Sequence, residues 1–410
     1  MDDRPVIAIV GTTGVGKTLL SIELAKALGG EVINADSMQV YKGLDIATNK
    51  ATPAERGNIP HHLLDFVNPS REYAVKDFMQ DATEAISSIY SRSKIPIIVG
   101  GTNYYIQSLL FHNKTIPSTS LPPPSSSISS SSTPTPHPSL TSHPLTPKIA
   151  EALTLSDPRT RTADQVKQYA QTDEMWNLLK EVDPGMAEMW HPRADRKIRR
   201  SLEIFYTTGK THSEWMAEQK AAAEGSKSEL RYRTIVFWLY ADPQVLYPRL
   251  DSRVDEMSKM GLFQELLDMR AKVLAGKVAG SAFNPTASSS IDEISEADHD
   301  DSKSDTSSTT SSPDADPQYT RFKEFHPYFT LLSTKPTDPQ LSLLQSQGVE
   351  EMKRATRQYA RRQISWIKNK LAGEVLGEME GGKAGFYLLD AGDLTKWNEE
   401  VRDKALGITQ

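Results

Sequence analysis

The chain has 410 residues, with 47 lysines and arginines against 53 aspartates and glutamates, a net charge of −6 and no cysteine. A single hydrophobic core rarely grows past ~250–300 residues, so the length indicates two or three domains. The lack of cysteine excludes disulfides, zinc–thiolate sites, iron–sulfur clusters and a thiol nucleophile. No apolar run approaches the ~18 residues of a membrane span, and the acidic sum argues against a nucleic-acid partner.

Two segments differ sharply in composition from the rest of the chain. Residues 117–147 hold 9 Pro, 11 Ser and 5 Thr with no charged residue, which predicts a disordered loop. Residues 281–317 carry nine acidic residues against the single Lys303, a net charge of −8. Since the whole chain carries −6, everything outside this second segment carries +2. The ordered part is therefore slightly basic, and the acidic balance belongs to one predicted disordered insertion.

Predicted strands and helices alternate in the first half of the chain. Residues 5–10 form a short, continuous apolar run typical of a buried parallel strand, and residues 18–28 repeat leucines at helical spacing up to a glycine pair. Further strands are predicted at residues 32–33, 95–99 and 234–239. From Pro243 onward helical periodicity dominates outside the acidic insertion. This order predicts an α/β fold with a parallel sheet that binds ligands at the carboxyl ends of its strands.

The segment between the first strand and the first helix matches the phosphate-binding pattern G-x4-G-K-[ST]. Glycines allow the backbone to curl so that several N–H groups point at phosphate oxygens, and the following helix N-terminus adds partial positive charge. Lys17 adds a full charge, and the Thr18 hydroxyl can bind Mg²⁺. The predicted phosphate-binding residues are Gly11, Thr12, Thr13, Gly14, Val15, Gly16, Lys17 and Thr18.

The first acidic side chain at a predicted strand end is Asp36, which follows the second strand. The strand at residues 95–99 ends in Gly-Gly-Thr, without the carboxylate that an ATPase or GTPase usually places there for magnesium. Asp36 would face the phosphate loop across the strand ends, where it suits a general base or a hydrogen-bond acceptor. A helix N-cap, with Gln39 completing a capping box, is the alternative interpretation.

Several separated motifs together resemble the tRNA isopentenyltransferase (tRNA dimethylallyltransferase) family, with spacing most similar to its eukaryotic, fungal-like members. The motifs are Gly11–Thr18, Asp36–Tyr41 with Gly43–Thr48, Ile59–Asp65, Val99–Tyr105, Arg199–Glu203 and Thr356–Trp366. The resemblance covers the chain apart from its two insertions and implies a P-loop NTPase-like core, a small helical insertion domain and C-terminal helices.

The resemblance implies transfer of a dimethylallyl group from dimethylallyl diphosphate to the exocyclic amine of the adenosine 3′ of the tRNA anticodon. The phosphate loop would then hold the prenyl diphosphate, with Lys17 and Mg²⁺ on Thr18 neutralising the leaving group. Asp36 would accept a proton from the amine, or orient it, once the base has left its stack.

The resemblance also implies tRNA contacts around the strand ends. Asp36, Ser37, Met38 and Gln39 would meet the base or its neighbours, and Thr102 matches a tRNA-contact position, although a tight turn with a satisfied hydroxyl is its other interpretation. Within residues 193–200, where Asp195 is the only acid, Lys197 or Arg200 is expected at the diphosphate and Arg196 close to the RNA. A solvated helix face is the alternative.

A second basic element falls on one helix face. At 100° per residue, Arg354, Arg357, Arg361 and Lys368 lie within about 60° of one another, opposite an apolar face. With the adjacent Arg362, this stripe is long enough to follow the phosphates of an RNA stem. A solubilising surface stripe is the alternative interpretation.

The predicted organisation is a catalytic core in residues 1–113, a disordered loop in 114–147, a tRNA-binding helical domain in 148–195, a return to the core in 196–280, an acidic insertion in 281–317 and tRNA-binding C-terminal helices in 318–410. With no cysteine, the zinc finger of eukaryotic relatives is expected to be absent. We expect a monomer without a membrane partner, located in the cytoplasm or also in mitochondria or the nucleus. Other functions left open are an adenylate isopentenyltransferase, a small-molecule P-loop kinase and a nonenzymatic RNA-binding protein.

Overall fold

The structure is a computed structural model that describes residues 5–69, 73–112, 143–144, 149, 153, 173–192, 194–225, 229–274, 324–379 and 381–409. Both predicted disordered segments, 114–147 and 281–317, lie outside this set except for residues 143–144. None of the described helices is long and apolar enough to cross a membrane.

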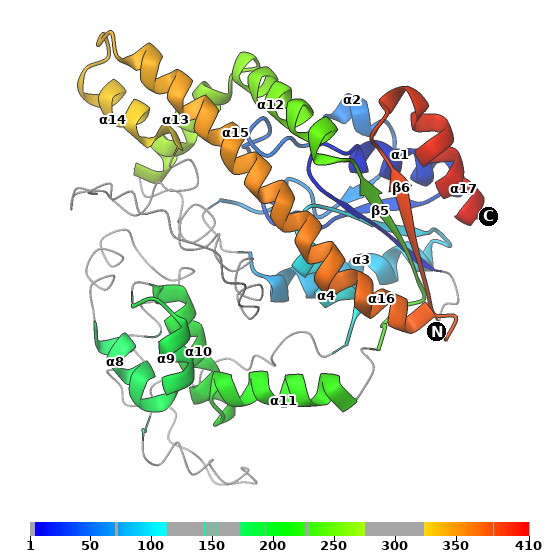
Figure 1. Ribbon diagram of the computed structural model, residues 1–410, viewed down its shortest axis with the longest axis horizontal. Coiled ribbons are helices and arrows are strands. Elements are labelled where there is room, and N and C mark those ends of the chain that lie inside the picture. The colour runs from blue at the N-terminus through cyan, green and yellow to red at the C-terminus, as the bar shows by residue number, and fades with distance from the viewer. Residues whose placement is uncertain are drawn as a thin grey trace.

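A six-stranded, fully parallel sheet forms the centre of the fold (Figure 1). Its strands, in spatial order, are β3 (His61–His62), β2 (Glu31–Asn34), β4 (Pro96–Val99), β1 (Val6–Gly11), β5 (Thr234–Tyr240) and β6 (Ala384–Asp390). This arrangement confirms the predicted α/β fold and the four predicted strands. Helices dominate after Pro243 as expected, but β6 was not predicted, because this edge strand leaves Tyr387 and Leu388 exposed and shows no clear alternation.

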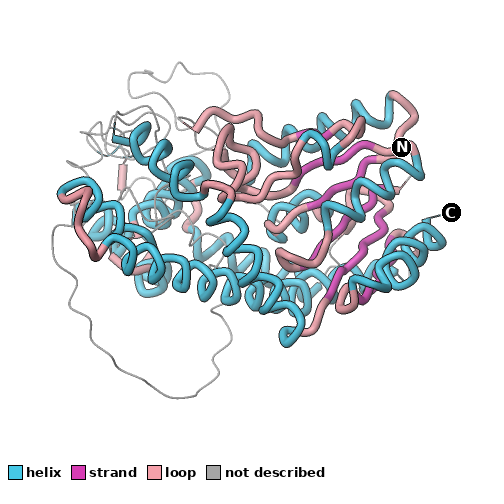
Figure 2. The backbone as a smooth tube through the Cα atoms, turned by 90° about the horizontal axis from the view of Figure 1, so that it is seen from above, coloured by secondary structure: helices cyan, strands magenta, loops and turns pink. Residues whose placement is uncertain are grey.

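Helices cover both faces of the sheet (Figure 2). Alternate residues of β1 point to opposite sides: Ile7 and Ile9 pack with α1 (Lys17–Leu28) and the C-terminal segment, whereas Val6 and Ala8 join the cluster of α3 (Val75–Ser91) and α4 (Asn103–Leu110). Burial on both faces explains why β1 is apolar at every position before Gly11. Because parallel strands end at one edge, the loops after β1, β2 and β4 meet there.

The C-terminal part of the chain is mostly helical and packs along this edge of the sheet. The 26-residue α15 lies beside α12 and α14, as Figure 1 shows. The elements are α12 (Pro243–Lys259), α13 (Leu262–Leu274), α14 (His326–Thr334), α15 (Leu341–Trp366), the π-helix η4 (Ile367–Leu371), α16 (Ala372–Met379), η5 (Leu394–Lys396), η6 (Asn398–Arg402) and α17 (Asp403–Thr409). The short helix α2 (Pro53–Arg56) precedes β3.

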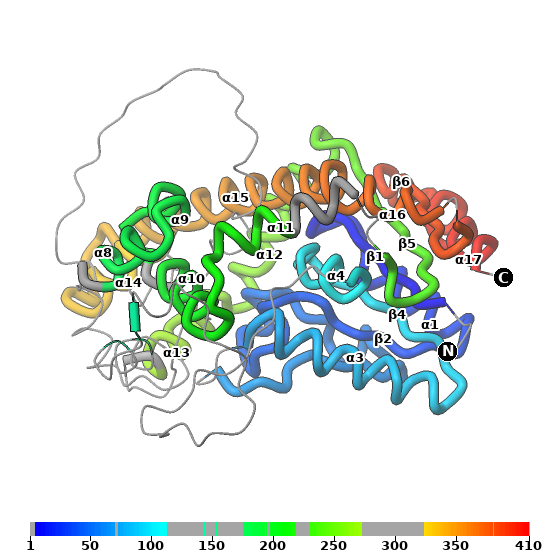
Figure 3. The backbone as a smooth tube through the Cα atoms, turned by 90° about the horizontal axis from the view of Figure 1, so that it is seen from below, coloured from blue at the N-terminus to red at the C-terminus, as the bar shows by residue number. Residues whose placement is uncertain are grey.

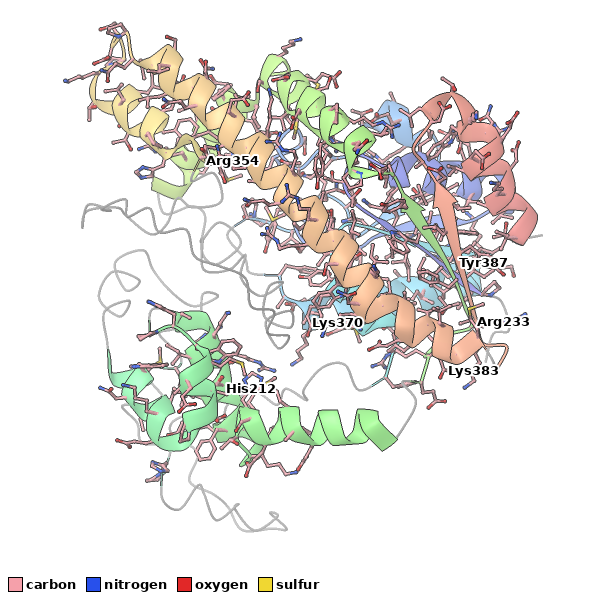
Figure 4. All side chains as sticks on the ribbon, in the orientation of Figure 1. His212, Arg233, Arg354, Lys370, Lys383 and Tyr387 are labelled. Atoms are coloured by element: carbon pink, nitrogen blue, oxygen red, sulfur yellow. The ribbon has the colours of Figure 1, made fainter. Side chains whose placement is uncertain are left out.

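Four helices form a separate unit: α8 (Asp173–Val182), α9 (Pro184–Met189), α10 (Asp195–Thr208) and α11 (His212–Gly225). Figure 3 shows α8, α9 and α10 grouped at the end of the molecule away from β6 and α17. Their own apolar cluster includes Trp190, Leu202 and Phe205, and His212 lies where α11 begins (Figure 4). The boundary expected at residue 195 was therefore wrong, because the apolar face of α10 packs on α8 and α9 and keeps that helix in the unit.

Candidate active site at the phosphate loop

The loop between β1 and α1 has the curled backbone that its sequence predicts. Gly11, Gly14 and Gly16 have φ angles of 149°, 83° and 87°, a region that side chains other than glycine rarely occupy. A Cβ on Gly11 would lie 2.5 Å from the backbone oxygen of Leu239 on the neighbouring strand. The buried Thr12 hydroxyl has no hydrogen-bond partner among the described residues. A polar atom buried without a partner in a phosphate loop is expected where a ligand supplies the missing contact.

Lys17 lies at the start of α1 and turns back into the loop. Its ammonium donates a hydrogen bond of 2.6 Å to the backbone oxygen of Thr12. Burial lowers the pKa of Lys17 to about 8, the Asp36 carboxylate raises it in part, and the Arg253 guanidinium lowers it further. The Asp36 carboxylate therefore acts on the charge of Lys17, and Arg253 is a second cation that does so.

That second cation, Arg253 of α12, was not among the predicted site residues. Its Nε donates to Asn49 Oδ1 at 3.0 Å, and its Nη1 donates to Thr13 Oγ1 at 3.2 Å. Burial lowers the pKa of Arg253, and the Asp36 carboxylate acts in the opposite sense. The sequence carried one signal: at 100° per residue Arg253 falls on the same helix face as the buried Leu250.

Asp36 follows β2 and sits in a tight turn. Its Oδ1 accepts a hydrogen bond from the backbone N–H of Met38 at 2.9 Å. No helix begins at Asp36, so the N-cap alternative was wrong: the carboxylate closes a local turn instead. A Cβ on Gly101 would lie 3.1 Å from Asp36 Oδ2, so the glycine after β4 leaves room for this carboxylate.

Gln363 of α15 joins the phosphate loop to the turn after β4. Its Oε1 accepts from the Thr13 N–H at 3.0 Å, and its Nε2 donates to the Gly101 oxygen at 2.8 Å. Tyr359, one turn earlier on α15, donates to the same oxygen at 3.0 Å. Gln363 is 3 % exposed. Spacing alone gave no reason to place this helix at the site, because the contact spans 350 residues.

The residues expected to contact tRNA after β2 and β4 lie next to Asp36. The buried Thr102 hydroxyl accepts from the Ser37 N–H at 2.9 Å and donates to Ser37 Oγ at 3.2 Å. The Thr102 hydroxyl is therefore satisfied within the protein, as the tight-turn interpretation expects. Ser37 itself is the residue next to Asp36. Gln39 Nε2 donates to the backbone oxygens of Thr48 and Asn49 at 3.0 and 3.3 Å. Its amide therefore supports the neighbouring loop, and Met38 beside it is half-buried.

The basic run on α10 lies in the helical unit. The Lys197 ammonium lies 4.4 Å from the centre of the Trp190 ring, inside that unit rather than on the phosphate loop. Arg200 forms an ion pair of 3.7 Å with Glu203 of its own helix. Burial lowers the pKa of Arg200, while the Glu203 carboxylate acts in the opposite sense. Arg196 lies in α10, with a side chain outside the described set.

Two arginines of the predicted stripe on α15 bind side chains of α12. Arg357 forms an ion pair with Asp251, and Arg361 Nε donates to the Tyr247 hydroxyl at 2.9 Å. Tyr247, Asp251 and Asp255 recur every fourth residue of α12, so they offer partners along the α15 stripe. The expectation of a fully open row of charges was therefore wrong at Arg357, whereas the side chain of Arg362 is exposed.

Comparison with known proteins identifies the same family that the sequence motifs resemble. A family model described as IPP transferase matches residues 39–370, and one described as isopentenyl transferase matches residues 4–65. The chain is 38% identical over 409 residues to the tRNA dimethylallyltransferase of Schizosaccharomyces pombe. This alignment covers 99% of the present chain and 78% of the S. pombe protein. It is 36% identical to the Saccharomyces cerevisiae protein of the same name, with 99% and 75% covered.

Solved structures agree with these relatives. A eukaryotic dimethylallyltransferase described as acting on tRNA matches with a TM-score of 0.65 and 34% identity, covering 99% of this chain and 78% of that one. A full-length tRNA isopentenylpyrophosphate transferase from Bacillus halodurans shares the fold, with a TM-score of 0.50, 24% identity and coverage of 99% and 97%.

Proposed function

This chain belongs to the tRNA dimethylallyltransferase (IPP transferase) family, and we propose that it transfers a dimethylallyl group from dimethylallyl diphosphate to an adenosine amine next to the tRNA anticodon. It is a prenyltransferase enzyme, as the names of its full-length relatives indicate. The resemblance found in its motifs is thereby confirmed.

One observation carries the proposal: two cations and a carboxylate converge on a glycine-rich phosphate loop. Lys17 and Arg253 donate to neutral oxygens of the loop, at 2.6 Å to Thr12 and at 3.2 Å to Thr13. A diphosphate leaves readily only when its developing negative charge is stabilised, and preorganised cations supply that stabilisation. The partnerless Thr12 hydroxyl adds a donor to the same place.

Asp36 is the acidic group opposite these cations, and its charge contributes to the pKa of both. One carboxylate oxygen is fixed by the Met38 N–H, which leaves the other for the acceptor amine. The nitrogen lone pair forms a bond to the allylic carbon, the carbon–oxygen bond to diphosphate breaks, and the amine proton passes to Asp36. The adenine amine is a weak base, so orienting it contributes alongside proton transfer.

We propose that a magnesium ion arrives with the substrate. Mg²⁺ in phosphate sites takes one or two protein oxygens, with phosphate oxygens and water completing its shell. The Thr18 hydroxyl at the start of α1 is an oxygen donor of this kind. No cluster of three or more acidic, histidine or cysteine side chains that could hold a metal occurs among the described residues. Bound there, the ion would neutralise charge on the leaving diphosphate.

The tRNA would enter between the core and the helical unit. Arg362 on α15 is exposed, and Arg200 lies on α10 of the helical unit, so each side contributes a positive charge. Ser37, next to Asp36 in the sequence, is hydrogen-bonded to Thr102.

The test offers three acceptors to the purified protein. Labelled dimethylallyl diphosphate and Mg²⁺ are incubated with an unmodified tRNA that has an adenosine-rich anticodon loop, with AMP, or with ATP alone. We expect label in the tRNA only. Label in AMP but not in tRNA would contradict the proposal and favour the adenylate isopentenyltransferase alternative. Formation of ADP from ATP that depends on an added small-molecule alcohol, with the phosphoryl group transferred to its hydroxyl, would favour a kinase.

A further inference from the structure

Asn49 is the side chain that directly holds Arg253 from outside the phosphate loop. Its Oδ1 accepts from Arg253 Nε at 3.0 Å, while Thr13 Oγ1 accepts from Nη1 at 3.2 Å. Both hydrogen-bond acceptors of the Arg253 side chain among the described residues are therefore neutral. An arginine more commonly meets a carboxylate when it must be held in place, because that pair is bidentate and strong.

A neutral acceptor has a different electrostatic consequence from a carboxylate. A carboxylate on Arg253 would cancel most of its charge as seen by an anionic substrate. An amide oxygen fixes the direction of the guanidinium without placing a negative charge against it. The Asp36, Glu256 and Glu55 carboxylates already act on Arg253 from a distance, so a further carboxylate in direct contact at position 49 would offset more of its charge.

The segment that carries Asn49 is anchored at several points outside the active site. Glu265 of α13 accepts from the backbone N–H groups of Ile46 and Ala47 at 3.0 and 2.8 Å. The almost fully buried Lys50 donates to the Tyr41 and Gly43 oxygens, each at 2.6 Å, and pairs with Asp45 and Asp65. The residues that anchor this segment thus surround Asn49 on both sides in the sequence.

Asn49 itself adopts a left-handed backbone conformation, with a φ of 50°. Asparagine and aspartate tolerate this region better than other residues except glycine. Gln39 Nε2 also donates to the Asn49 backbone oxygen at 3.3 Å. Position 49 therefore combines a fixed, unusual backbone with a side-chain oxygen aimed at the active-site arginine.

We propose that Asn49 is a positioning residue that orients Arg253 toward the diphosphate of the substrate without adding a negative charge in contact with it. The inference rests on the proposed function, since it assumes that the anion bound at the phosphate loop is the diphosphate of the prenyl donor. It assigns the anchored segment 43–50 a role in setting the electrostatics of the donor site.

Two substitutions separate charge from orientation, and both suit the backbone at position 49. Asn49→Asp keeps the shape and gives Arg253 an ion-pair partner, so we expect inorganic pyrophosphate to bind about tenfold more weakly. The melting temperature should stay equal or rise, because an ion pair replaces a neutral contact. Asn49→Gly removes the oxygen that accepts from Arg253 and adds no charge beside the guanidinium. We therefore expect kcat to fall about tenfold, while pyrophosphate affinity stays within about threefold of the wild-type value.

Asn58→Asp is the matched control, because it adds the same charge at an exposed position. Pyrophosphate binding is measured by titration calorimetry, kcat by prenyl transfer to tRNA, and stability by thermal melting. Wild-type pyrophosphate affinity in Asn49→Asp would overturn the inference, as would a loss of affinity matched by an equal loss of stability in both variants. A wild-type protein that binds pyrophosphate but transfers no prenyl group would instead contradict the proposed function.

Discussion

At the scale of single residues, the site depends on the Asp36 carboxylate, whose charge acts on the two cations Lys17 and Arg253. The Asp36 carboxylate is fixed through the Met38 N–H, and Gly101 leaves room for its second oxygen. The same charge that would receive a proton also opposes the binding of an anionic donor. Removing the charge should therefore affect turnover and donor binding in opposite directions.

We expect Asp36→Asn to lower kcat by about 10²–10⁴-fold, the range for loss of a general base. The asparagine oxygen can still accept from Met38, so the turn should persist. Pyrophosphate should bind at least as tightly, because a negative charge has left the site. Single-turnover prenyl transfer and calorimetry measure the two effects, and unchanged turnover would reduce Asp36 to a turn-forming residue.

The lowered pKa of Lys17 predicts a pH dependence of donor binding. Burial brings this pKa to about 8 in the free protein, so the ammonium loses its charge as the pH rises past that value. Pyrophosphate affinity should be constant below about pH 7 and should decline above pH 8. Lys17→Met should bind weakly at all pH values and lose this slope. An unchanged slope in the variant would assign the titration to another group.

At the scale of elements, α15 connects the active site to the remainder of the C-terminal helices. Gln363 of this helix contacts the phosphate loop. Farther toward its N-terminus, Gly348 packs against Phe325, the residue before α14. A Cβ on Gly348 would lie 2.4 Å from Phe325 Cδ1, and Phe325 is fully buried. The glycine costs helix stability, but it allows close packing of this ring.

Gly348→Ala should therefore destabilise the protein by about 1–3 kcal/mol, because overpacking at Phe325 exceeds the gain in helix propensity. Gly377→Ala on α16 is the matched control, since a Cβ there meets nothing within 4 Å. That variant should be stabilised by up to about 1 kcal/mol. Chemical denaturation measures both, and a stabilised Gly348→Ala would show that Phe325 can move aside.

The arginines of α15 should divide into two groups by function. Arg357 pairs with Asp251, so Arg357→Gln should lower the melting temperature. Arg362 is exposed, so Arg362→Gln should weaken tRNA binding and reduce its salt slope by about 1. Filter binding at several salt concentrations tests this division. If both variants change only stability, the stripe has no role in tRNA binding.

At the scale of the whole molecule, each edge of the sheet has its own charged cluster. The active site places cations at the carboxyl ends of the strands, whereas at the opposite edge cations surround one buried carboxylate. Glu31 begins β2, is 2 % exposed, and meets Arg92, Lys94 and His62 at 2.7–2.8 Å. Burial alone would raise its pKa, but hydrogen bonds from these three partners lower it to about 2.

This lowered pKa makes Glu31 a source of acid-sensitive stability. A carboxyl whose pKa is lower in the folded state stabilises the protein fully above its unfolded pKa of 4.5, and that contribution is lost as the pH falls toward 2. Glu31→Gln should be less stable than wild type at pH 7, and the difference should shrink between about pH 4.5 and pH 2. Urea unfolding across this range measures it. A constant difference would assign the effect to packing.

The sequence by itself determined the parts of this protein that depend on neighbouring residues. A buried parallel strand needs a continuous apolar run, and a phosphate loop needs glycines at fixed spacing, so β1 and residues 11–18 were predictable. Asp36 does follow the second strand as predicted, but its helix-cap alternative could be discarded only once the backbone was known. The family followed from several such local motifs in order.

Only the tertiary structure decided which distant groups share the site. Arg253 and Gln363 contact the phosphate loop from 240 and 350 residues away, and Asn49 contacts Arg253. No periodicity encodes such contacts. The same reason explains the errors: Arg357 found a partner on α12, and α10 packed with the helical unit. Local pattern fixes the backbone of an element, whereas the partner of a charged side chain is set by how elements pack.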